Sequence, residues 1–575
     1  MLPFDNSDYR IDDLKENNIL VVDGGDGNFD DGDYLLFYAD SPVDWFLENG
    51  YFRHSINFFS DTAFFFVTRD NIPGSAARVS ELNLGGIPDI TVNDFLDHQL
   101  YERNDTNFIM SGRQWYDGQS FLTVKSRQYT FNVPNVKSVT AHARIVVLSR
   151  VFGRSSSFSL SFNDIGNFSI PISQSTRPGP YDKYAIPAVG TFDFIPSGNS
   201  ITIDLTFDNS SFADNGWLDY IELNTTRALA FTGQQFNFRN PSTLYAAVAR
   251  YNLTSSDNDV SVWDVTDPQN AVQLRLQGAA GNFYFQQSGD TIREYVVFGN
   301  SQHEPLLKGP VPNQNLHSIQ QADYVIVVHP KFLSEANRLG QFHRSTHGYN
   351  VVVVTTEQVY NEFSSGKQDM TAIKDFMKML ADRASTDEEY PNWLLLFGDA
   401  SYNYKDGIVN NTSFIPSYQS NNSLEPLKSF ISDDYFGFLD DDESDAISSS
   451  LDIGIGRLPV QTIQEANAVV NKLILYQSSP SAMRPWRTMV TFVGDDEDSN
   501  THMVQSDNLA RRLDTTHQEY NIKKIYLDAY PQVSNSGGDS YPDVKELLDK
   551  SIEGGSLILS YIGHGGEAGW TLSLI

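Results

Sequence analysis

The pattern of apolar and polar residues changes once along the chain, near residue 321. Before that point, short alternating runs are separated by turns rich in Gly, Asn, Asp, Ser and Pro, which is typical of antiparallel sheets. After it, short continuous apolar runs alternate with amphipathic stretches, as in a parallel sheet covered by helices on both faces. The pattern predicts a multidomain chain: all-β, sandwich-like N-terminal domains, then a doubly wound α/β domain.

The β part divides into three regions at its turns and linkers. Residues 1–125 predict an incomplete β-rich domain, in which residues 92–104 are the clearest helix-like piece. Residues 126–228 predict a β-sandwich. Residues 229–320 predict a small β domain that ends in a linker rich in Pro and Asn. Strands are expected at residues 34–38, 63–68, 141–148, 157–162, 201–207 and 217–223.

The α/β domain is predicted over residues 321–575, with its strands in one parallel, doubly wound sheet. Such sheets bind ligands beyond the carboxyl ends of their strands, so polar residues that follow strands are site candidates. Asp399 follows one predicted strand, Asp495 and Asp496 follow another, and His564 follows a third. Strands are expected at residues 323–328, 351–354, 393–399, 489–494, 525–527 and 557–562, and helices at 332–347, 370–383, 463–476, 503–514 and 542–552.

His564 is the main chemical candidate. Gly563 and Gly565 flank it and allow backbone N–H groups to approach a ligand closely. An imidazole at a strand end can act as a general acid or base, although a turn histidine without chemistry fits the same residues. A carboxylate from Asp495 or Asp496 could fix the tautomer of this imidazole. The alternative for residues 495–498 is a solvated or calcium-binding acidic loop.

Composition narrows the chemistry. The 575 residues contain no cysteine, which excludes disulfides, thiolate metal sites and a thiol nucleophile within them. The net charge of −33 argues against nucleic acid and anionic membranes as partners. No apolar run reaches the roughly 18 residues of a membrane helix. The first ten residues are polar and acidic, unlike a signal peptide, and both ends are expected to be cut points in a longer protein.

The motifs of other kinds of active site and metal site are absent or incomplete. There is no G-x-S-x-G elbow of a serine hydrolase and no phosphate-binding P-loop. His343 and His347 have metal-ligand spacing, but they lack the glutamate of H-E-x-x-H and lie at a helix end that favours histidine by itself. The acidic loop at residues 24–33 could hold calcium, but without EF-hand spacing it is better interpreted as a solvated turn.

Several motifs resemble, in order, those of the gingipain family of cysteine peptidases. The resemblance covers about residues 322–575 and implies a caspase-like α/β fold. Residues 111–116 and 262–268 are most similar to the branch of the family that acts as the sortase of the type IX secretion system. The stretches that carry the family resemblance are 393–399 (WLLLFGD), 432–436 (SDDYF), 452–459 (DIGIGRLP) and 559–565 (LSYIGHG).

The resemblance implies a Cys/His mechanism. His564 matches the catalytic histidine, and the N–H of Gly565 matches the oxyanion donor. Asp496 matches the acidic partner of the histidine, with Asp495 as the alternative if the alignment slips by one residue. The family cysteine lies on the strand that follows, beyond Ile575, so these residues alone are expected to be inactive. No cofactor is implied for the chemistry; calcium is implied as a structural ion without assigned ligands.

The resemblance also implies what the protein acts on. Sortases of this branch remove C-terminal sorting signals from secreted cargo proteins, after which an amine captures the acyl-enzyme. The implied partners are such cargo proteins and other type IX components at the outer membrane, and the implied location is the cell surface. Two alternatives remain open at this point: a secreted gingipain-like protease, and a non-catalytic secreted protein that binds carbohydrate or protein.

Overall fold

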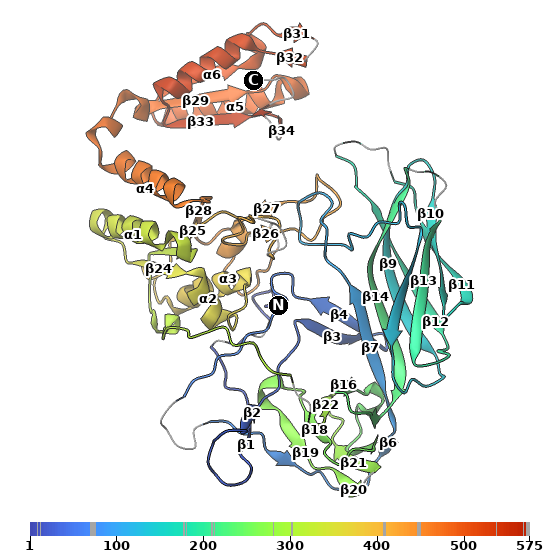
Figure 1. Cartoon of the computed structure of the whole chain (residues 1–575). Coiled ribbons are helices and arrows are strands. Elements are labelled where there is room, and N and C mark those ends of the chain that lie inside the picture. Colours follow the sequence, from blue (N-terminus) through green and yellow to red (C-terminus); the bar gives the residue numbers. More distant parts are fainter. Residues whose placement is uncertain are drawn as a thin grey trace. The chain divides into compact units, whose positions relative to one another are not determined.

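The structure of the chain is a computed structural model (Figure 1). It describes residues 1–570 apart from residues 9, 12, 70–75, 176–178, 180, 209–210, 212, 280, 301–302, 406–409, 446–449, 536–537 and 567–568. The chain folds into two compact units, Met1–Asn467 and Ala468–Ile575. Among the described residues, no helix combines the length and the apolar character needed to cross a membrane.

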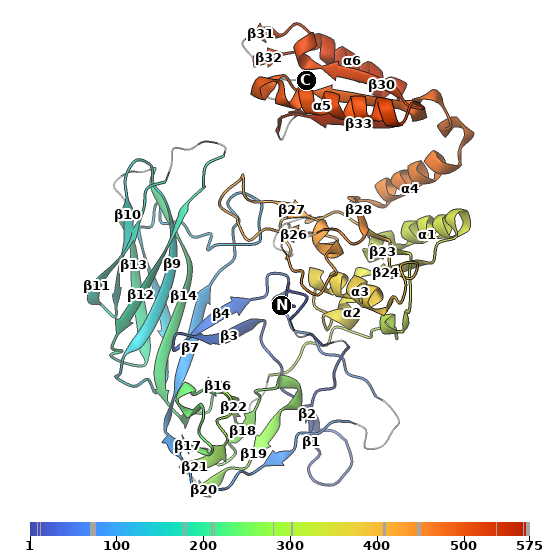
Figure 2. The same cartoon turned by 180° about the vertical axis from the view of Figure 1, so that it is seen from behind.

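Two sheets in the first unit share one apolar core (Figure 2). The larger sheet has the order β12-β9-β14-β7-β16-β22-β18-β19-β5, and the smaller has the order β11-β10-β13-β8. Phe158 and Ile203 of the smaller sheet and Ile145 of the larger one are fully buried in this core. The strands are β5 (Glu81–Leu82), β7 (Asp94–Glu102), β8 (Ser126–Asn132), β9 (Ala141–Arg150), β10 (Ser156–Phe162), β11 (Ile165–Ile172), β12 (Ile186–Phe194), β13 (Ser200–Asp208), β14 (Asn215–Ala228), β16 (Phe236–Arg239), β18 (Ser261–Asp264), β19 (Val272–Leu274) and β22 (Glu294–Phe298).

The strands predicted between residues 141 and 223 are confirmed as β9, β10, β13 and β14. Their apolar residues alternate, as in β13, where every second side chain is buried. The larger sheet takes strands from residues 81 to 298, so three of the regions predicted from the sequence contribute to one sheet.

The helix predicted at residues 92–104 is wrong, because most of this stretch is strand β7. Its apolar residues Val92, Phe95, Leu96 and Leu100 are spaced like one face of a helix. Strand β7 lies between β14 and β16 and pairs with both. A central strand can bury side chains on both faces, so its apolar residues do not need to alternate.

The remaining β structure of the first unit consists of a five-stranded sheet and short ribbons. The expected strand at residues 63–68 is wrong, since these residues pair with no described strand. One of their aromatic rings, that of Phe65, packs against the ring of Phe37, 5.0 Å away. The strands are β1 (Leu20–Val22) with β2 (Tyr34–Leu36), β3 (Val43–Glu48) with β4 (Tyr51–Ile56), β26 (Tyr418–Gln419) with β27 (Ile431–Ser432), and the sheet of β6 (Ile90–Val92), β15 (Ala230–Phe231), β17 (Ala249–Ser255), β20 (Gln277–Ala279) and β21 (Asn282–Gln287).

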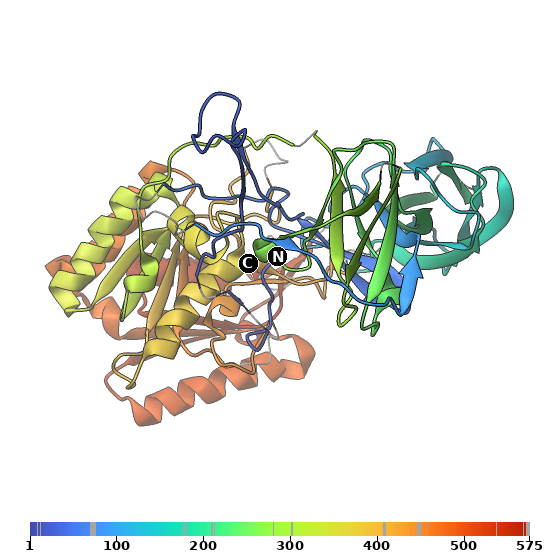
Figure 3. The same cartoon turned by 90° about the horizontal axis from the view of Figure 1, so that it is seen from below.

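A parallel sheet with the order β24-β23-β25-β28 follows in the first unit. The chain moves from β23 to one side through α1, and then across to the other side through α2 and α3. Because such crossovers are right-handed, these helices cover opposite faces of the sheet; Figure 3 shows them, yellow-green to yellow, around the strands. The elements are β23 (Tyr324–Val328), α1 (Leu333–His347), β24 (Val351–Thr355), α2 (Thr356–Phe363), α3 (Met370–Arg383), β25 (Trp393–Phe397) and β28 (Gly454–Leu458).

The second unit contains its own parallel sheet, with the order β30-β29-β33. The prediction of a single parallel sheet over residues 321–575 is therefore wrong. The parallel strands described in this region are divided over two sheets, one in each unit. The apolar pattern predicts each strand but not its pairing partner, and β29 pairs with β30 and β33. The elements are α4 (Ile463–Ser478), which runs across the boundary, and β29 (Met489–Gly494), α5 (Glu497–Thr516), β30 (Asn521–Tyr526), β31 (Val533–Asn535), β32 (Gly538–Ser540), α6 (Pro542–Gly554), β33 (Ile558–Ile562), β34 (Gly565–Gly566) and β35 (Gly569–Trp570).

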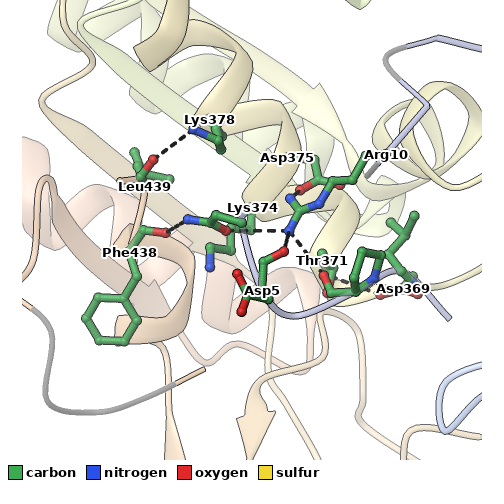
Figure 4. A network of polar contacts seen from close by, with 12 residues as sticks. Asp5, Arg10, Asp369, Thr371, Lys374, Asp375, Lys378, Phe438 and Leu439 are labelled. Atoms are coloured by element: carbon green, nitrogen blue, oxygen red, sulfur yellow. Dashed lines mark hydrogen bonds and ion pairs between the residues drawn. The ribbon is translucent and has the colours of Figure 1, made fainter. Parts of the chain in front are cut away.

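The start of the chain, residues 1–8 and residue 10, packs against the α/β part of the first unit (Figure 4). The backbone N–H of Leu2 donates to Asp369 at 3.0 Å, and the guanidinium of Arg10 pairs with Asp375. Burial raises the pKa of the Asp375 carboxyl to about 7, against the opposing effect of Arg10. Burial also lowers the pKa of the neighbouring Lys374 to about 8. The segment is thus attached by charges as well as by apolar packing.

Candidate active site

The candidate site lies at the carboxyl ends of β29 and β33, two neighbouring strands of the second unit. From β29 the chain crosses through α5 to β30, and it then returns through α6 to the other side of β29. The strand order therefore reverses between β29 and β33, and a crevice at such a point is where doubly wound sheets bind ligands. Asp495 directly follows β29, and His564 follows β33 after one glycine.

Asp495 is the carboxylate that contacts His564 on the side of the strand ends. Its Oδ2 accepts a hydrogen bond from the backbone N–H of His564 at 3.2 Å and lies 3.4 Å from His564 Nδ1. The side chain of Asp495 is fully buried, whereas that of His564 is 39% exposed. Burial by itself raises the pKa of the Asp495 carboxyl, but backbone N–H groups of His564 and Asp496 donate to it and hold that pKa below its usual range. Asp495 is thus an ionised acceptor at neutral pH.

Gly563 explains why the two strand ends can come so close. A Cβ atom at this position would lie 2.5 Å from the Cβ of Asp495 and 2.4 Å from the hydroxyl of Tyr561. That hydroxyl donates to the carbonyl oxygen of His564 at 2.6 Å, and the Tyr561 ring stacks on Trp570 at 4.7 Å. The glycine and the tyrosine together fix the backbone that presents His564.

Asp496 has a different partner from Asp495. Its carboxylate accepts a hydrogen bond from the hydroxyl of Tyr541. Burial raises the pKa of that hydroxyl, and the Asp496 carboxylate raises it further. Of the two aspartates that the sequence leaves open, the structure therefore brings Asp495 to His564 and Asp496 to Tyr541, while their catalytic roles stay predictions.

His564 has three more neighbours, all in the first turns of α5. Glu497 Oε2 lies 3.2 Å from His564 Nδ1, and Asp498 Oδ2 lies 3.3 Å from His564 Nε2. The ring of His502 packs against that of His564 with centroids 4.8 Å apart and an angle of 85° between the planes. The sequence analysis missed His502; the available signal was its position four residues after Asp498 in the helix that follows β29.

The backbone between these neighbours is strained. Asp498, Ser499 and Asn500 have φ values of 53°, 57° and 64°, in the left-handed region that costs about 1–2 kcal/mol for each non-glycine residue. This left-handed turn, of which Asp498 is the first residue, interrupts α5, with Glu497 before it and His502 after it. The acidic run is therefore a structured turn against His564 rather than the solvated loop that the sequence also allowed.

Gly565, the predicted oxyanion donor, follows His564 in β34. This two-residue strand pairs with β35, where Gly565 faces Trp570. Among the residues that the structure describes, a Cβ on Gly565 would meet only the carbonyl oxygen of Gly569, at 4.0 Å. The position fits a backbone donor next to the histidine, and its oxyanion role stays a prediction.

Asp399 does not belong to this sheet. It follows β25 in the first unit, where its carboxylate accepts from Gln461 Nε2 at 2.7 Å. The other family-like stretches of that unit meet at Arg457, whose guanidinium donates to both carboxylate oxygens of Asp433 at 2.7 Å and to the carbonyl of Gly398 at 3.0 Å. Such a bidentate ion pair fixes the loops that follow the strands. These motif residues therefore have a structural role in the first unit.

The described residues contain two groups of side chains that could hold a metal ion, and neither lies in the acidic loop at residues 24–33. One comprises Asp440, Glu443 and Asp452, whose carboxylates already accept backbone N–H groups: Glu443 from Asp440, and Asp452 from Leu439. Structural calcium stays a prediction. The second group comprises Asp495, His502 and His564.

Comparison with known proteins places the second half of the chain in a family. The family model described as peptidase family C25 matches residues 317–575. No curated protein matches the chain. Among solved structures, dimeric latent PorU from Porphyromonas gingivalis matches with a TM-score of 0.69 and 27% identity, covering 83% of this chain. The chain spans 46% of the length of that PorU chain.

Two carbohydrate-binding modules match smaller parts of the chain. A CBM36 module in complex with calcium and xylotriose matches with a TM-score of 0.13 and 15% identity, over 17% of this chain and 71% of its own. A CBM36-1 domain from the hindgut metagenome of Trinervitermes trinervoides matches with a TM-score of 0.15 and 12% identity, over 22% and 96%. Residues 317–575 belong to peptidase family C25, the gingipain family that the motifs around His564 indicated, and the chain as a whole is similar to PorU.

Proposed function

We propose that the protein is a cysteine-type endopeptidase in which His564 is the general base and Asp495 its orienting partner. The observation that carries this proposal is the contact of Asp495 with Nδ1 of His564, at adjoining strand ends within the region that matches peptidase family C25. Asp495 and Glu497 both lie beside Nδ1, whereas only the largely exposed Asp498 lies beside Nε2, and this arrangement favours the imidazole proton on Nδ1. Nε2 is then the nitrogen that can accept a proton from a nucleophile.

The proposed reaction uses a thiol that approaches Nε2 of His564. Nε2 takes the thiol proton, and the thiolate sulfur attacks the scissile carbonyl carbon, whose π electrons move onto oxygen. The N–H of Gly565 stabilises that oxyanion. As the carbonyl re-forms, the C–N bond breaks and the imidazolium gives its proton to the departing amine. Water or a second amine then releases the acyl group from sulfur.

The thiol must come from outside the 575 residues, since these contain no cysteine. We therefore infer that the chain of this length does not cleave peptides. A longer chain that adds the next strand with its cysteine is the form expected to be active. The contact between Asp495 and His564 would be the same in both forms.

We propose that the substrates are secreted cargo proteins with C-terminal sorting signals, processed at the cell surface together with other type IX components. The similarity to PorU supports this proposal because it extends over 83% of the chain and so includes much of the β-rich region. In such a sortase, the acyl group passes to an amine of an acceptor molecule. A secreted protease of general specificity would transfer it to water.

The first experiment compares the chain of 575 residues with a chain extended through the next cysteine of the gene, on a peptide that spans a sorting-signal junction. Only the longer chain should cleave, and alkylation with iodoacetamide should abolish cleavage. His564→Ala should lower kcat/KM by about 10²–10⁴-fold. Cleavage by the shorter chain, or full activity of His564→Ala, would exclude the proposed chemistry.

Asp495→Asn and Asp496→Asn form a matched pair in the longer chain. Asp495→Asn should reduce kcat by more than about 10²-fold because the imidazole loses the partner that fixes its tautomer. Asp496→Asn removes only the negative charge beside Tyr541, whose hydroxyl can still donate to the asparagine oxygen, and should change kcat less than tenfold. The reverse order would assign the role to Asp496. If an added amine never competes with water for the acyl group, the sortase part of the proposal fails while the peptidase part stands.

A further inference from the structure

The geometry points to a binding site for a divalent transition metal of the Zn²⁺ class, formed by Asp495, His502 and His564. We infer that a metal bound there prevents His564 from acting as a base, a regulatory consequence that rests on the proposed function. The binding site itself does not depend on that function. It is built from three parts of the second unit: the end of β29, the start of the regular part of α5, and the end of β33.

The three side chains already lie at metal-site separations. One ligand atom from each of Asp495, His502 and His564 lies within 4.8 Å of the others. His564 Nδ1 is 3.4 Å from Asp495 Oδ2 and 3.2 Å from Glu497 Oε2. In a tetrahedral zinc site with bonds of 2.0–2.1 Å, the ligand atoms are about 3.3 Å apart. Glu497 contacts His564 but is not within ligand distance of the whole group, so the fourth position is left to water.

His502 supplies an independent observation. Its Nδ1 is buried, and within the described part of the chain it has no hydrogen-bond partner. A buried imidazole nitrogen without a partner is costly in a purely structural role. Its other nitrogen, Nε2, lies 3.8 Å from Asp498 Oδ2. The ring thus stands among carboxylates and a second imidazole, the surroundings in which neutral histidine commonly binds a metal.

The donor set selects the kind of metal. Two imidazole nitrogens with one carboxylate suit Zn²⁺ and other transition metals, whereas Ca²⁺ takes six to eight oxygen ligands. The left-handed turn at residues 498–500 also restricts how far the ligands on either side of it can separate. We therefore expect Zn²⁺ to bind and Ca²⁺ not to compete at comparable concentrations.

The effect on His564 follows from its tautomer. A neutral imidazole that binds a metal through Nδ1 carries its proton on Nε2. Nε2 is then a hydrogen-bond donor and cannot accept the proton of a thiol. The metal would also occupy the carboxylate of Asp495, which otherwise orients the ring. Binding is thus expected to switch the peptidase off reversibly, and a chelator should restore activity.

Binding is tested on the chain of 575 residues, without substrate, by calorimetric titration with Zn²⁺ and by the visible absorption of Co²⁺. We expect one Zn²⁺ per chain and Co²⁺ bands of tetrahedral intensity. His502→Gln should weaken Zn²⁺ binding more than about tenfold, and His564→Gln should do the same. His517→Gln is the matched control, since His517 lies at the C-terminal end of α5 with a side chain that is 55% exposed. Binding that His502→Gln leaves unchanged, or Ca²⁺ binding in place of Zn²⁺, would overturn the site.

Inhibition is tested on the longer, cysteine-containing chain. Zn²⁺ should inhibit it, and His502→Gln should require at least a tenfold higher Zn²⁺ concentration for the same fractional loss, each form being measured relative to its own activity in metal-free buffer. Equal inhibition of both forms would place the metal on the thiol and refute the role of His502. If the longer chain has no peptidase activity, the proposed function fails, and the calorimetric titration alone decides the metal site.

Discussion

His54 of strand β4 should make the β-rich part less stable as the pH rises. Its side chain is 7% exposed, and it lies between two carboxylates: Nδ1 is 2.7 Å from Glu222 and Nε2 is 2.8 Å from Glu102. Burial by itself lowers the pKa of His54, but the two carboxylates outweigh it and raise the pKa to about 9. The other charged or titratable groups around it are Arg53, Arg144, Asp219 and Tyr220.

The magnitude follows from the difference between the folded and unfolded pKa of His54. A rise from 6.5 to about 9 corresponds to about 3 kcal/mol of stability at 1.36 kcal/mol per pKa unit. Because the folded pKa is the higher one, this contribution is fully present below pH 6.5. It is lost as the pH rises through 9, where the folded protein also releases the proton.

The assay is hydrogen exchange of the backbone amides of β3 and β4, which gives the free energy of opening this hairpin. We compare the wild type with His54→Gln, which keeps a polar side chain but does not titrate. The difference between them should shrink by about 3 kcal/mol from pH 6 to pH 9.5. Burial raises the pKa of Asp219 to about 8, and the charge on His54 opposes this rise, so both proteins carry Asp219→Asn to remove this second titration.

A constant difference between the two proteins from pH 6 to pH 9.5 would refute the reasoning, because the charge on His54 would then contribute nothing. Glu102→Gln provides a second check. Removing one of the two carboxylates should lower the folded pKa of His54, so the loss of protection should begin at a lower pH than in the wild type.

Four other substitutions test features of the two units. Gly563→Ala in the longer chain should reduce activity by about 10²-fold, since its Cβ would displace Asp495 or Tyr561, and unchanged kcat/KM would contradict the packing. Arg457→Lys should destabilise the first unit by about 2–3 kcal/mol in urea, because lysine cannot bridge both oxygens of its partner; a loss below about 0.5 kcal/mol would count against this. Ser499→Gly should stabilise the second unit by about 1 kcal/mol by relieving a left-handed φ of 57°, and destabilisation would argue against that conformation. Phe4→Ala should cost about 2 kcal/mol, because its ring packs 5.8 Å from Tyr435 on the buried core, and an unchanged melting temperature would show that the segment is dispensable.

Much of the candidate site could be predicted because it depends on local pattern. The apolar run at residues 557–562 ends in glycine and histidine, and the run at 489–494 ends in acidic residues. Strands of this kind place the residues that follow them at the same edge of a parallel sheet. The pattern alone therefore predicts that His564 lies near the pair of aspartates, and β29 and β33 do lie side by side.

The choice between Asp495 and Asp496 was beyond that pattern. Successive residues at a strand end point in different directions, so a shift of one position exchanges the partners of both side chains. The hydroxyl of Tyr541, which binds Asp496, comes from a residue 45 positions away. His502 was missed for a related reason: only the left-handed turn before it determines which side of α5 meets His564.

Pairing over long sequence distances was also not predictable. The apolar pattern located most strands of the α/β region, but it does not say that β28 and β29 belong to different sheets. Nor does it distinguish a central strand such as β7 from a helix, because pairing on both sides determines the conformation of that stretch. The local pattern also does not predict that the start of the chain packs on the core near Asp375.

That last contact has a consequence for how the protein is made. Arg10 and Asp375 are 365 positions apart, and closing a loop of that length costs about 5 kcal/mol. A ribosome that adds about 5–20 residues per second needs about 20–70 s to synthesise the intervening chain. During that time Phe4 and its neighbours have no core to cover and are open to chaperones or to other nascent chains. A fusion tag that sequesters the first ten residues would therefore affect the folding of a region made much later in translation.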